Sequence, residues 1–186
     1  MASNAIIFKA TIHIADMDRQ YYQNHVLTLA RHPSETDERM MVRLLAFVLH
    51  AHESLSFGRG LSAEEEPALW RKDLTSAIDL WIEVGQPEEK TIHRACGRAK
   101  QVCIYTYGGR GADQWWEKNL VALERLDNLS VMSLPLDGSR ALATLVQPSM
   151  QLQCTVQEGQ IWMADGENTA HIELTILKDA STPFRQ

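Results

Sequence analysis

The chain has 186 residues, of which 45% are hydrophobic and 23% charged, which is typical of one globular domain and excludes a disordered, collagen-like or coiled-coil chain. Eighteen basic against 24 acidic residues give a net charge of −6, which excludes a uniformly basic nucleic-acid coat but not a local basic patch. The three cysteines form no C-x-x-C pair, and no uncharged run approaches the roughly 20 residues that span a bilayer. We therefore expect a cytoplasmic protein that makes no contact with a membrane.

The first predicted elements are two strands and a long helix. Residues 6–15 place Ile12 and Ile14 in alternation with polar side chains, which is typical of a half-buried strand, and a second strand is expected over residues 26–30. Residues 34–54 are expected to form a helix, because a serine and two acidic residues precede apolar side chains at helical spacing. The apolar stripe of this helix consists of Met41, Leu44, Leu45, Val48 and Leu49.

A two-stranded hairpin, a second helix and a buried strand follow. Residues 68–73 and 77–85 are expected to pair as antiparallel strands around a short turn, and the second strand alternates between an apolar and a polar face. Pro87 is placed to begin a helix, and residues 102–107 form a short apolar run. The predicted core is thus a helix–hairpin–helix–strand unit over residues 34–107.

The remaining pattern predicts further helices and strands. Helices are expected over residues 112–125 and 138–146, and strands over residues 129–134, 150–156, 160–163 and 170–177. The three strands between residues 150 and 177 are expected to be antiparallel. The predicted fold class is α/β or α+β, as a single domain over residues 1–186. Its mixed central sheet would be flanked by helices, with antiparallel hairpins at the N- and C-terminal ends.

Three carboxylates of this unit are candidates for a metal site. Glu53 lies near the end of the first helix, and Glu83 lies on the polar face of the second hairpin strand. If the hairpin turns at residues 74–77, Glu66 comes within reach of that same face. Mg²⁺ is commonly held by one or two carboxylates together with a substrate phosphate, so convergence of these acids predicts a magnesium site. The alternative is that all three are solvated surface acids.

Two other patterns point to weaker candidates. His50 and His52 precede Glu53, but two residues of separation on a helix direct side chains about 200° apart, and His52 is expected to continue the buried stripe. The glycine-rich residues 108–111 lie between a strand and a helix, where backbone amides could hold a phosphate. They match no complete phosphate-binding motif, so a simple turn is favoured there.

Four segments distributed along the chain resemble bacterial YaeQ proteins. They read TLARHPSET at 28–36, FGRGL at 57–61, DLWIEVG at 79–85 and RACGRA at 94–99. YaeQ proteins are similar in fold to the PD-(D/E)XK restriction-endonuclease-like group. The resemblance therefore implies a variant of that fold, whose core has the same order of helix, hairpin, helix and strand.

The resemblance also assigns roles to individual residues. Glu83 matches the acidic residue of the D/E-x-K motif, but Gly85 occupies the position of its lysine. Gln86 or Lys90 would then orient water or phosphate, although the helical wheel favours a solvent-exposed position for Lys90.

The Pro-Asp element of the nuclease motif is absent as such. Asp73 is the aspartate that sequence order offers for it, but it lies at the tip of the hairpin, whereas Glu66 has the better geometry. Glu53 matches the acidic residue that many members of the group carry on the first helix.

Two functions follow as alternatives. The first is a Mg²⁺-dependent phosphodiester hydrolase acting on nucleic acid, with Mn²⁺ as a substitute ion and Glu53, Glu66 or Asp73, and Glu83 as ligands. The second is a catalytically inactive module of the same fold that binds a protein or a nucleic acid. The vacant lysine position and the acidic net charge favour the second.

Overall fold

The strands are divided between two sheets. The computed structural model describes residues 4–63 and 65–181. A five-stranded sheet has the order β10-β9-β8-β1-β2, and a six-stranded sheet has the order β11-β7-β6-β5-β4-β3. The first contains β1 (Ile6–Asp16), β2 (Tyr21–Arg31), β8 (Ser149–Gln157), β9 (Gln160–Ala164) and β10 (Thr169–Glu173). The second contains β3 (Leu55–Phe57), β4 (Leu69–Lys72), β5 (Ile78–Val84), β6 (Ala99–Thr106), β7 (Leu129–Ser133) and β11 (Thr175–Lys178).

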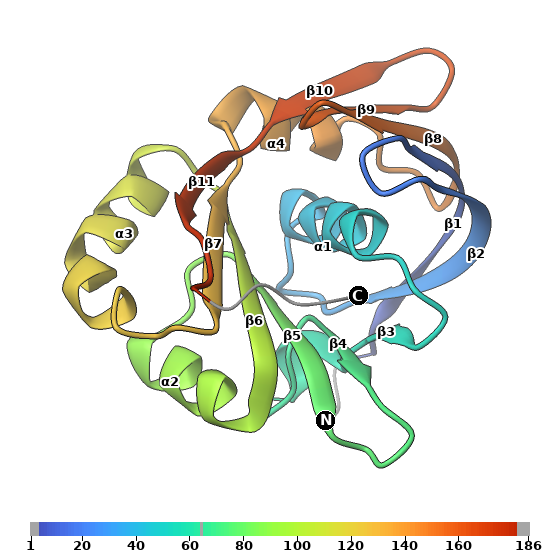
Figure 1. Cartoon of the computed structure of the whole chain (residues 1–186). Coiled ribbons are helices and arrows are strands. Elements are labelled where there is room, and N and C mark those ends of the chain that lie inside the picture. Colours follow the sequence, from blue (N-terminus) through green and yellow to red (C-terminus); the bar gives the residue numbers. More distant parts are fainter. Residues whose placement is uncertain (1–3, 64, 182–186) are drawn as a thin grey trace.

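The helices separate and cover these sheets. They are α1 (Asp37–Leu49), α2 (Glu89–Arg98), α3 (Arg110–Leu123) and α4 (Leu136–Ala143), together with a 3₁₀ turn at Gly60–Ser62. Figure 1 shows α1 between the two sheets, with α2 and α3 on the opposite face of the six-stranded sheet. The larger hydrophobic core surrounds α1, and a smaller core lies under α2 and α3. The α+β class is confirmed, with two mixed sheets where we expected one central sheet.

Helix α1 is shorter than predicted at both ends. Thr36 caps its first turn, because its side-chain oxygen accepts from the backbone amide of Arg39 at 3.1 Å. At the other end, Arg19 donates to the carbonyl oxygens of Val48 (3.1 Å) and Ala51 (3.4 Å), where the helix has stopped. Residues 40–48 are all buried, because α1 meets a sheet on each side.

The predicted hairpin is confirmed as β4 and β5. Its register pairs Leu69 with Ile82 and Trp70 with Trp81. The turn between the strands is stabilised by Asp73, whose carboxylate accepts from the backbone amides of Thr75 (2.8 Å) and Ala77 (3.0 Å). Strands β5, β6 and β7 are parallel to one another, as two strand–helix–strand units require.

Other boundaries differ from the pattern. Residues 170–177 form two strands in different sheets rather than one, since the chain leaves β10 at Leu174 and crosses to β7 as β11. Strand β2 begins at Tyr21 rather than at residue 26, because its full pairing with β1 stabilises a segment of weak alternation. Among the described residues, no helix is long and apolar enough to cross a membrane.

Candidate functional site

A cavity of about 530 Å³ lies where the end of α1 meets the β4–β5 hairpin and the turn between β1 and β2. Its walls are partly apolar, with Tyr21, Ala51 and Leu74 among the lining residues. Acidic and basic groups occur there in equal numbers. The charged lining residues are Arg19, Glu53, Arg71, Lys72, Asp73 and Asp79. A hollow with an apolar wall and several charged groups is the usual form of a ligand site, so this cavity is the candidate functional site.

Arg19 lies at the edge of the cavity, with all three guanidinium nitrogens hydrogen-bonded to protein groups. Its Nε atom lies 2.8 Å from Oδ2 of the buried Asp16, and its two terminal nitrogens donate to the carbonyls at the end of α1. The guanidinium carbon lies 5.0 Å from the centre of the Tyr21 ring. A cation at a helix C-terminus opposes the negative end of the helix dipole, so the fold keeps this arginine in one position.

The β4–β5 hairpin supplies four of the other charges of the cavity, Arg71, Lys72, Asp73 and Asp79. Lys100 Nζ lies 2.6 Å from Asp79 and 3.8 Å from Asp73, so both acids have a cationic neighbour. Hydrogen bonds from Thr75 lower the pKa of Asp73. Partial burial lowers the pKa of Arg71, and the Asp79 carboxylate opposes this shift. Arg71 is thus a partly desolvated cation in the cavity wall.

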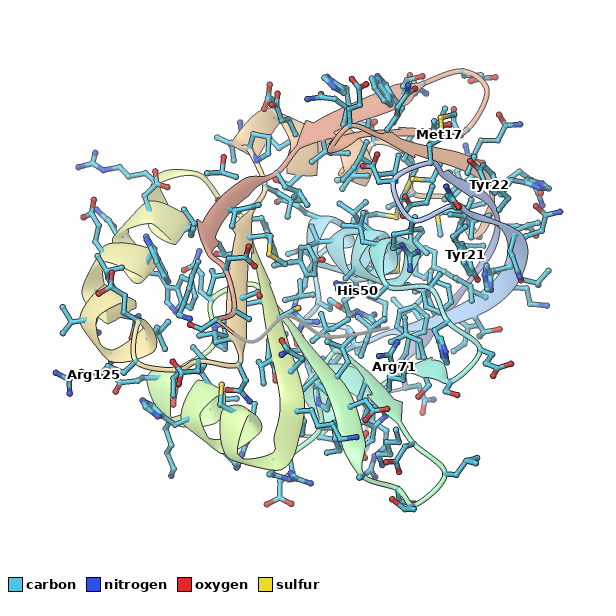
Figure 2. All side chains as sticks on the ribbon, in the orientation of Figure 1. Met17, Tyr21, Tyr22, His50, Arg71 and Arg125 are labelled. Atoms are coloured by element: carbon cyan, nitrogen blue, oxygen red, sulfur yellow. The ribbon has the colours of Figure 1, made fainter. Side chains whose placement is uncertain are left out.

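A histidine and a tyrosine form a hydrogen bond close to these arginines. His50 Nε2 lies 2.6 Å from the hydroxyl of the buried Tyr105. Burial, together with the positive charges of Arg19 and Arg71, lowers the pKa of His50 to about 4. Figure 2 labels His50, Arg71 and Tyr21, which come from the end of α1, from β4 and from β2. His50 is therefore neutral at physiological pH.

The lowered pKa of His50 predicts a pH-dependent stability. The ordinary histidine pKa is 6.5, so the unfolded chain binds a proton more readily and stability is lost as the pH falls from 6.5 toward 4. Between about pH 7 and about pH 5 we expect a loss of about 2 kcal/mol from this group. Urea unfolding at both pH values should show this loss in the wild type and not in His50→Gln. His52→Gln, which changes an exposed histidine, should behave like the wild type, and an unchanged pH dependence in His50→Gln would contradict the assignment.

The structure separates the four acids predicted as metal ligands. Glu53 and Asp73 line the cavity, whereas Glu66 and Glu83 lie elsewhere. Glu66 is paired with Arg59, with Oε1 2.8 Å from Nη2. Within residues 4–63 and 65–181 there is no group of three or more His, Cys, Asp or Glu side chains that could hold a metal ion. Metal binding by these acids stays a prediction.

Glu83 is buried beneath α2 rather than exposed on a polar face. The indole nitrogen of Trp81 donates to its Oε1 at 2.7 Å. Burial raises the pKa of Glu83, while the hydrogen bond from Trp81 and the charges of Arg39 and Arg94 act in the opposite direction. The strand face that carries Glu83 is thus the packing surface for a helix, which accounts for its low exposure.

The remaining sequence candidates lie at the surface. The Gln86 amide donates to the carbonyl oxygen of Tyr107 at 3.2 Å, at the start of the glycine-rich segment. Lys90 is exposed in the first turn of α2, as the helical wheel predicted. His52 was expected in the buried stripe, and this is wrong, because α1 ends at Leu49 and His52 is exposed in the following turn.

Comparison with known proteins decides the family. The family model described as YaeQ protein matches residues 1–174. The chain belongs to the YaeQ family. The resemblance of the four sequence segments is thereby confirmed. Two relatives named "Uncharacterized protein YaeQ" come from Salmonella typhi and Escherichia coli K12. They are 46% identical over 182 residues and 44% identical over 181 residues, each covering 97% of this chain and 100% of the relative.

Crystal structures of YaeQ proteins have the same fold. The YaeQ protein from Xanthomonas axonopodis pv. citri matches with a TM-score of 0.91 and 44% identity, over 94% of this chain and 98% of that one. The YaeQ protein from Pseudomonas syringae matches with a TM-score of 0.90 and 34% identity, over 96% of this chain and 98% of that one. This chain therefore shares its overall fold with both of these YaeQ proteins.

Several residues of the YaeQ-family cavity were missed from the sequence. Arg19 follows a strand at a turn, and nothing near it in the sequence indicates that it lies against the end of α1. Arg71, Lys72 and Asp79 flank the hairpin turn, and this concentration of charge was the available signal. Such a pattern does not by itself indicate a cavity, because charged residues near a turn are most often solvated.

Proposed function

We propose that this YaeQ-family protein binds the phosphate groups of a nucleic acid in the cavity beside the β4–β5 hairpin. The observation that carries the proposal is that three basic residues, Arg19, Arg71 and Lys72, line one hollow, where the Arg71 guanidinium is partly desolvated. Arginine and lysine are the usual phosphate partners in proteins, and a partly desolvated guanidinium binds a phosphate more strongly than a fully hydrated one.

Two of the three acids that line the cavity have a cation outside its lining beside them. Asp73 and Asp79 have Lys100 beside them, and Asp73 also accepts hydrogen bonds from the hairpin turn. Lys100 therefore compensates part of the charge of these two acids, and the Asp79 carboxylate also acts on Arg71 in the cavity wall. A phosphate would be bound by a few basic residues of the cavity and not by a basic surface, which is consistent with the net charge of −6 of the whole chain.

Binding to labelled single- and double-stranded oligonucleotides tests this proposal. Each of Arg71→Gln and Lys72→Gln is expected to weaken binding about tenfold, the size of one charge-assisted hydrogen bond. The affinity of the wild type should fall as salt is raised, with a smaller slope in either variant. Lys118→Gln removes an exposed charge on α3 and should leave the affinity unchanged. Equal affinities for all four proteins would contradict the proposal.

Mg²⁺-dependent phosphodiester hydrolysis is a second candidate function. It is favoured by Glu53 and Asp73, two of the predicted acids, which line the same cavity as the basic residues. The protein's own donor set does not fit a complete metal site in the described residues. Two carboxylates and a substrate phosphate can nevertheless share one Mg²⁺ ion, so the ion would bind together with the substrate.

Calorimetric titration with Mn²⁺ in the presence of an oligonucleotide distinguishes the two functions. A cavity-bound ion predicts that Glu53→Gln abolishes both Mn²⁺ binding and cleavage, whereas Glu83→Gln retains them. Loss in Glu83→Gln alone would instead place the ion at the end of β5, as the nuclease motif implies. If no Mn²⁺ binds and the oligonucleotide still does, the protein is a binding module without hydrolase activity.

A further inference from the structure

The five-stranded sheet ends in a long, regular edge strand. Strand β2 has 11 residues and pairs with β1 without interruption, from Ile6 opposite Arg31 to Asp16 opposite Tyr21. Among the strands that the structure describes, β2 pairs with β1 alone. Figure 1 shows it at the right-hand limit of the molecule. Half of its backbone amides and carbonyls therefore point away from the sheet.

This edge lacks the features that usually prevent strand pairing between molecules. Residues 21–30 contain no Asp, Glu, Lys, Arg or Pro, and the ladder with β1 has no bulge. Protected edges normally carry a charge, a proline or a bulge, or are very short. The other edge strands are protected by their short length, since β3 has 3 residues, β11 has 4 and β10 has 5.

We propose that β2 pairs antiparallel with β2 of a second copy of this chain, with the twofold axis at Val26. Val26 is 81% exposed and would then lie opposite Val26 of the second copy. On the same outer face Asn24 would lie opposite Thr28, and Tyr22 opposite Ala30. The facing valines form an apolar pair, Asn24 and Thr28 form a polar pair, and Tyr22 and Ala30 form a mixed pair. Contacts between facing side chains of this kind stabilise antiparallel strands.

The charges of the strand agree with a second copy as the occupant. Arg31 is the one Asp, Glu, Lys or Arg residue of β2, and in this register it would lie opposite Tyr21, so no like charges meet. On the inner face His25 would lie opposite Leu27, and both are only partly buried in the single chain. A twofold arrangement of this kind is isologous, and it closes with two copies instead of continuing into a fibre.

The molecular mass in solution tests the pairing. Sedimentation velocity over a range of concentrations should show the wild type approaching twice its chain mass of 21.0 kDa. Val26→Glu, which places two carboxylates opposite each other, should sediment as a monomer, whereas Val26→Thr should remain dimeric. Ile7→Glu is the matched control, because Ile7 is 54% exposed on β1, away from the free edge, and its variant should dimerise. A monomeric wild type, or an unaltered dimer in Val26→Glu, would overturn the proposal.

Oxidative cross-linking tests the register independently. Val26→Cys should form a disulfide-linked dimer, because residue 26 lies opposite itself. Thr28→Cys should not, because its counterpart in the second copy is Asn24. The native thiols should not compete, since Cys103 and Cys154 are buried and burial raises the pKa of Cys96 to about 11. Cross-linking by Thr28→Cys and not by Val26→Cys would overturn the pairing centred on Val26.

Discussion

Replacing Glu35 with alanine is expected to lower the free energy of unfolding by about 3–5 kcal/mol, because it leaves a buried guanidinium without its carboxylate. The side chains of Glu35 and Arg43 are each 1% exposed. Arg43 Nε lies 2.7 Å from Oε1 and Arg43 Nη2 lies 2.9 Å from Oε2, so the pair is bidentate. Arg39 adds a third contact, with Nη1 2.7 Å from Oε1.

Urea unfolding at neutral pH measures this loss. The matched control is Asp37→Ala, which breaks the pair between Arg31 and Asp37 at the surface, where the Asp37 side chain is 48% exposed. Exposed pairs contribute little, so this control should lose no more than about 1 kcal/mol. The double variant Glu35→Ala/Arg43→Met should recover much of the stability, because it removes the unpaired charge. A loss in Glu35→Ala as small as that in Asp37→Ala would refute the prediction.

Gly58→Ala is expected to cost about 3 kcal/mol, because the new methyl group has no space. A Cβ atom at Gly58 would overlap the carbonyl oxygen of Pro67, which is backbone and cannot rotate away. The Gly58 amide also donates to the carbonyl of Ala68 at 3.0 Å, next to the short pairing of β3 with β4. The substitution should therefore separate these two segments.

Gly97→Ala is expected to raise the stability of the protein, in contrast to Gly58→Ala. Gly97 lies in α2, and a Cβ atom there would meet nothing within 4 Å. Alanine is the better helix former, so this variant should be more stable by roughly 0.5–1 kcal/mol. Thermal unfolding of the two variants beside the wild type measures both effects. Similar destabilisation by both substitutions would show that loss of glycine itself, rather than the contact with Pro67, is responsible.

The sequence located most of the helices and strands because their patterns are local. The spacing of Met41, Leu44, Leu45 and Val48 predicted α1, and all four side chains are fully buried. Alternation in residues 77–85 predicted β5 and its pairing with β4. Boundaries were less accurate where distant groups contact an element, as at the end of α1, where Arg19 donates to the carbonyl oxygen of Val48.

The candidate site was only partly predictable. Glu53 and Asp73 were among the predicted acids, and both line the cavity. The placement of Glu53 on the first helix is wrong, because α1 ends at Leu49 and Glu53 lies in the turn that follows. Glu83 was predicted on the polar face of its strand as a metal ligand, with a solvated surface acid as the alternative. Its burial depends on the packing of α2 over Trp81, which no local pattern records.

By itself, the sequence determined a single domain of mixed helices and strands, the order of the core elements and the resemblance to the YaeQ family, because periodicity and motifs are properties of short segments. The tertiary structure alone decided that the strands form two sheets around α1. It also brought together Arg19, Glu53 and Arg71 at one cavity, and among the described strands it gave β2 a partner on one side only. The physical reason is that periodicity states which face of an element is buried, whereas the partner that covers this face is chosen by long-range packing.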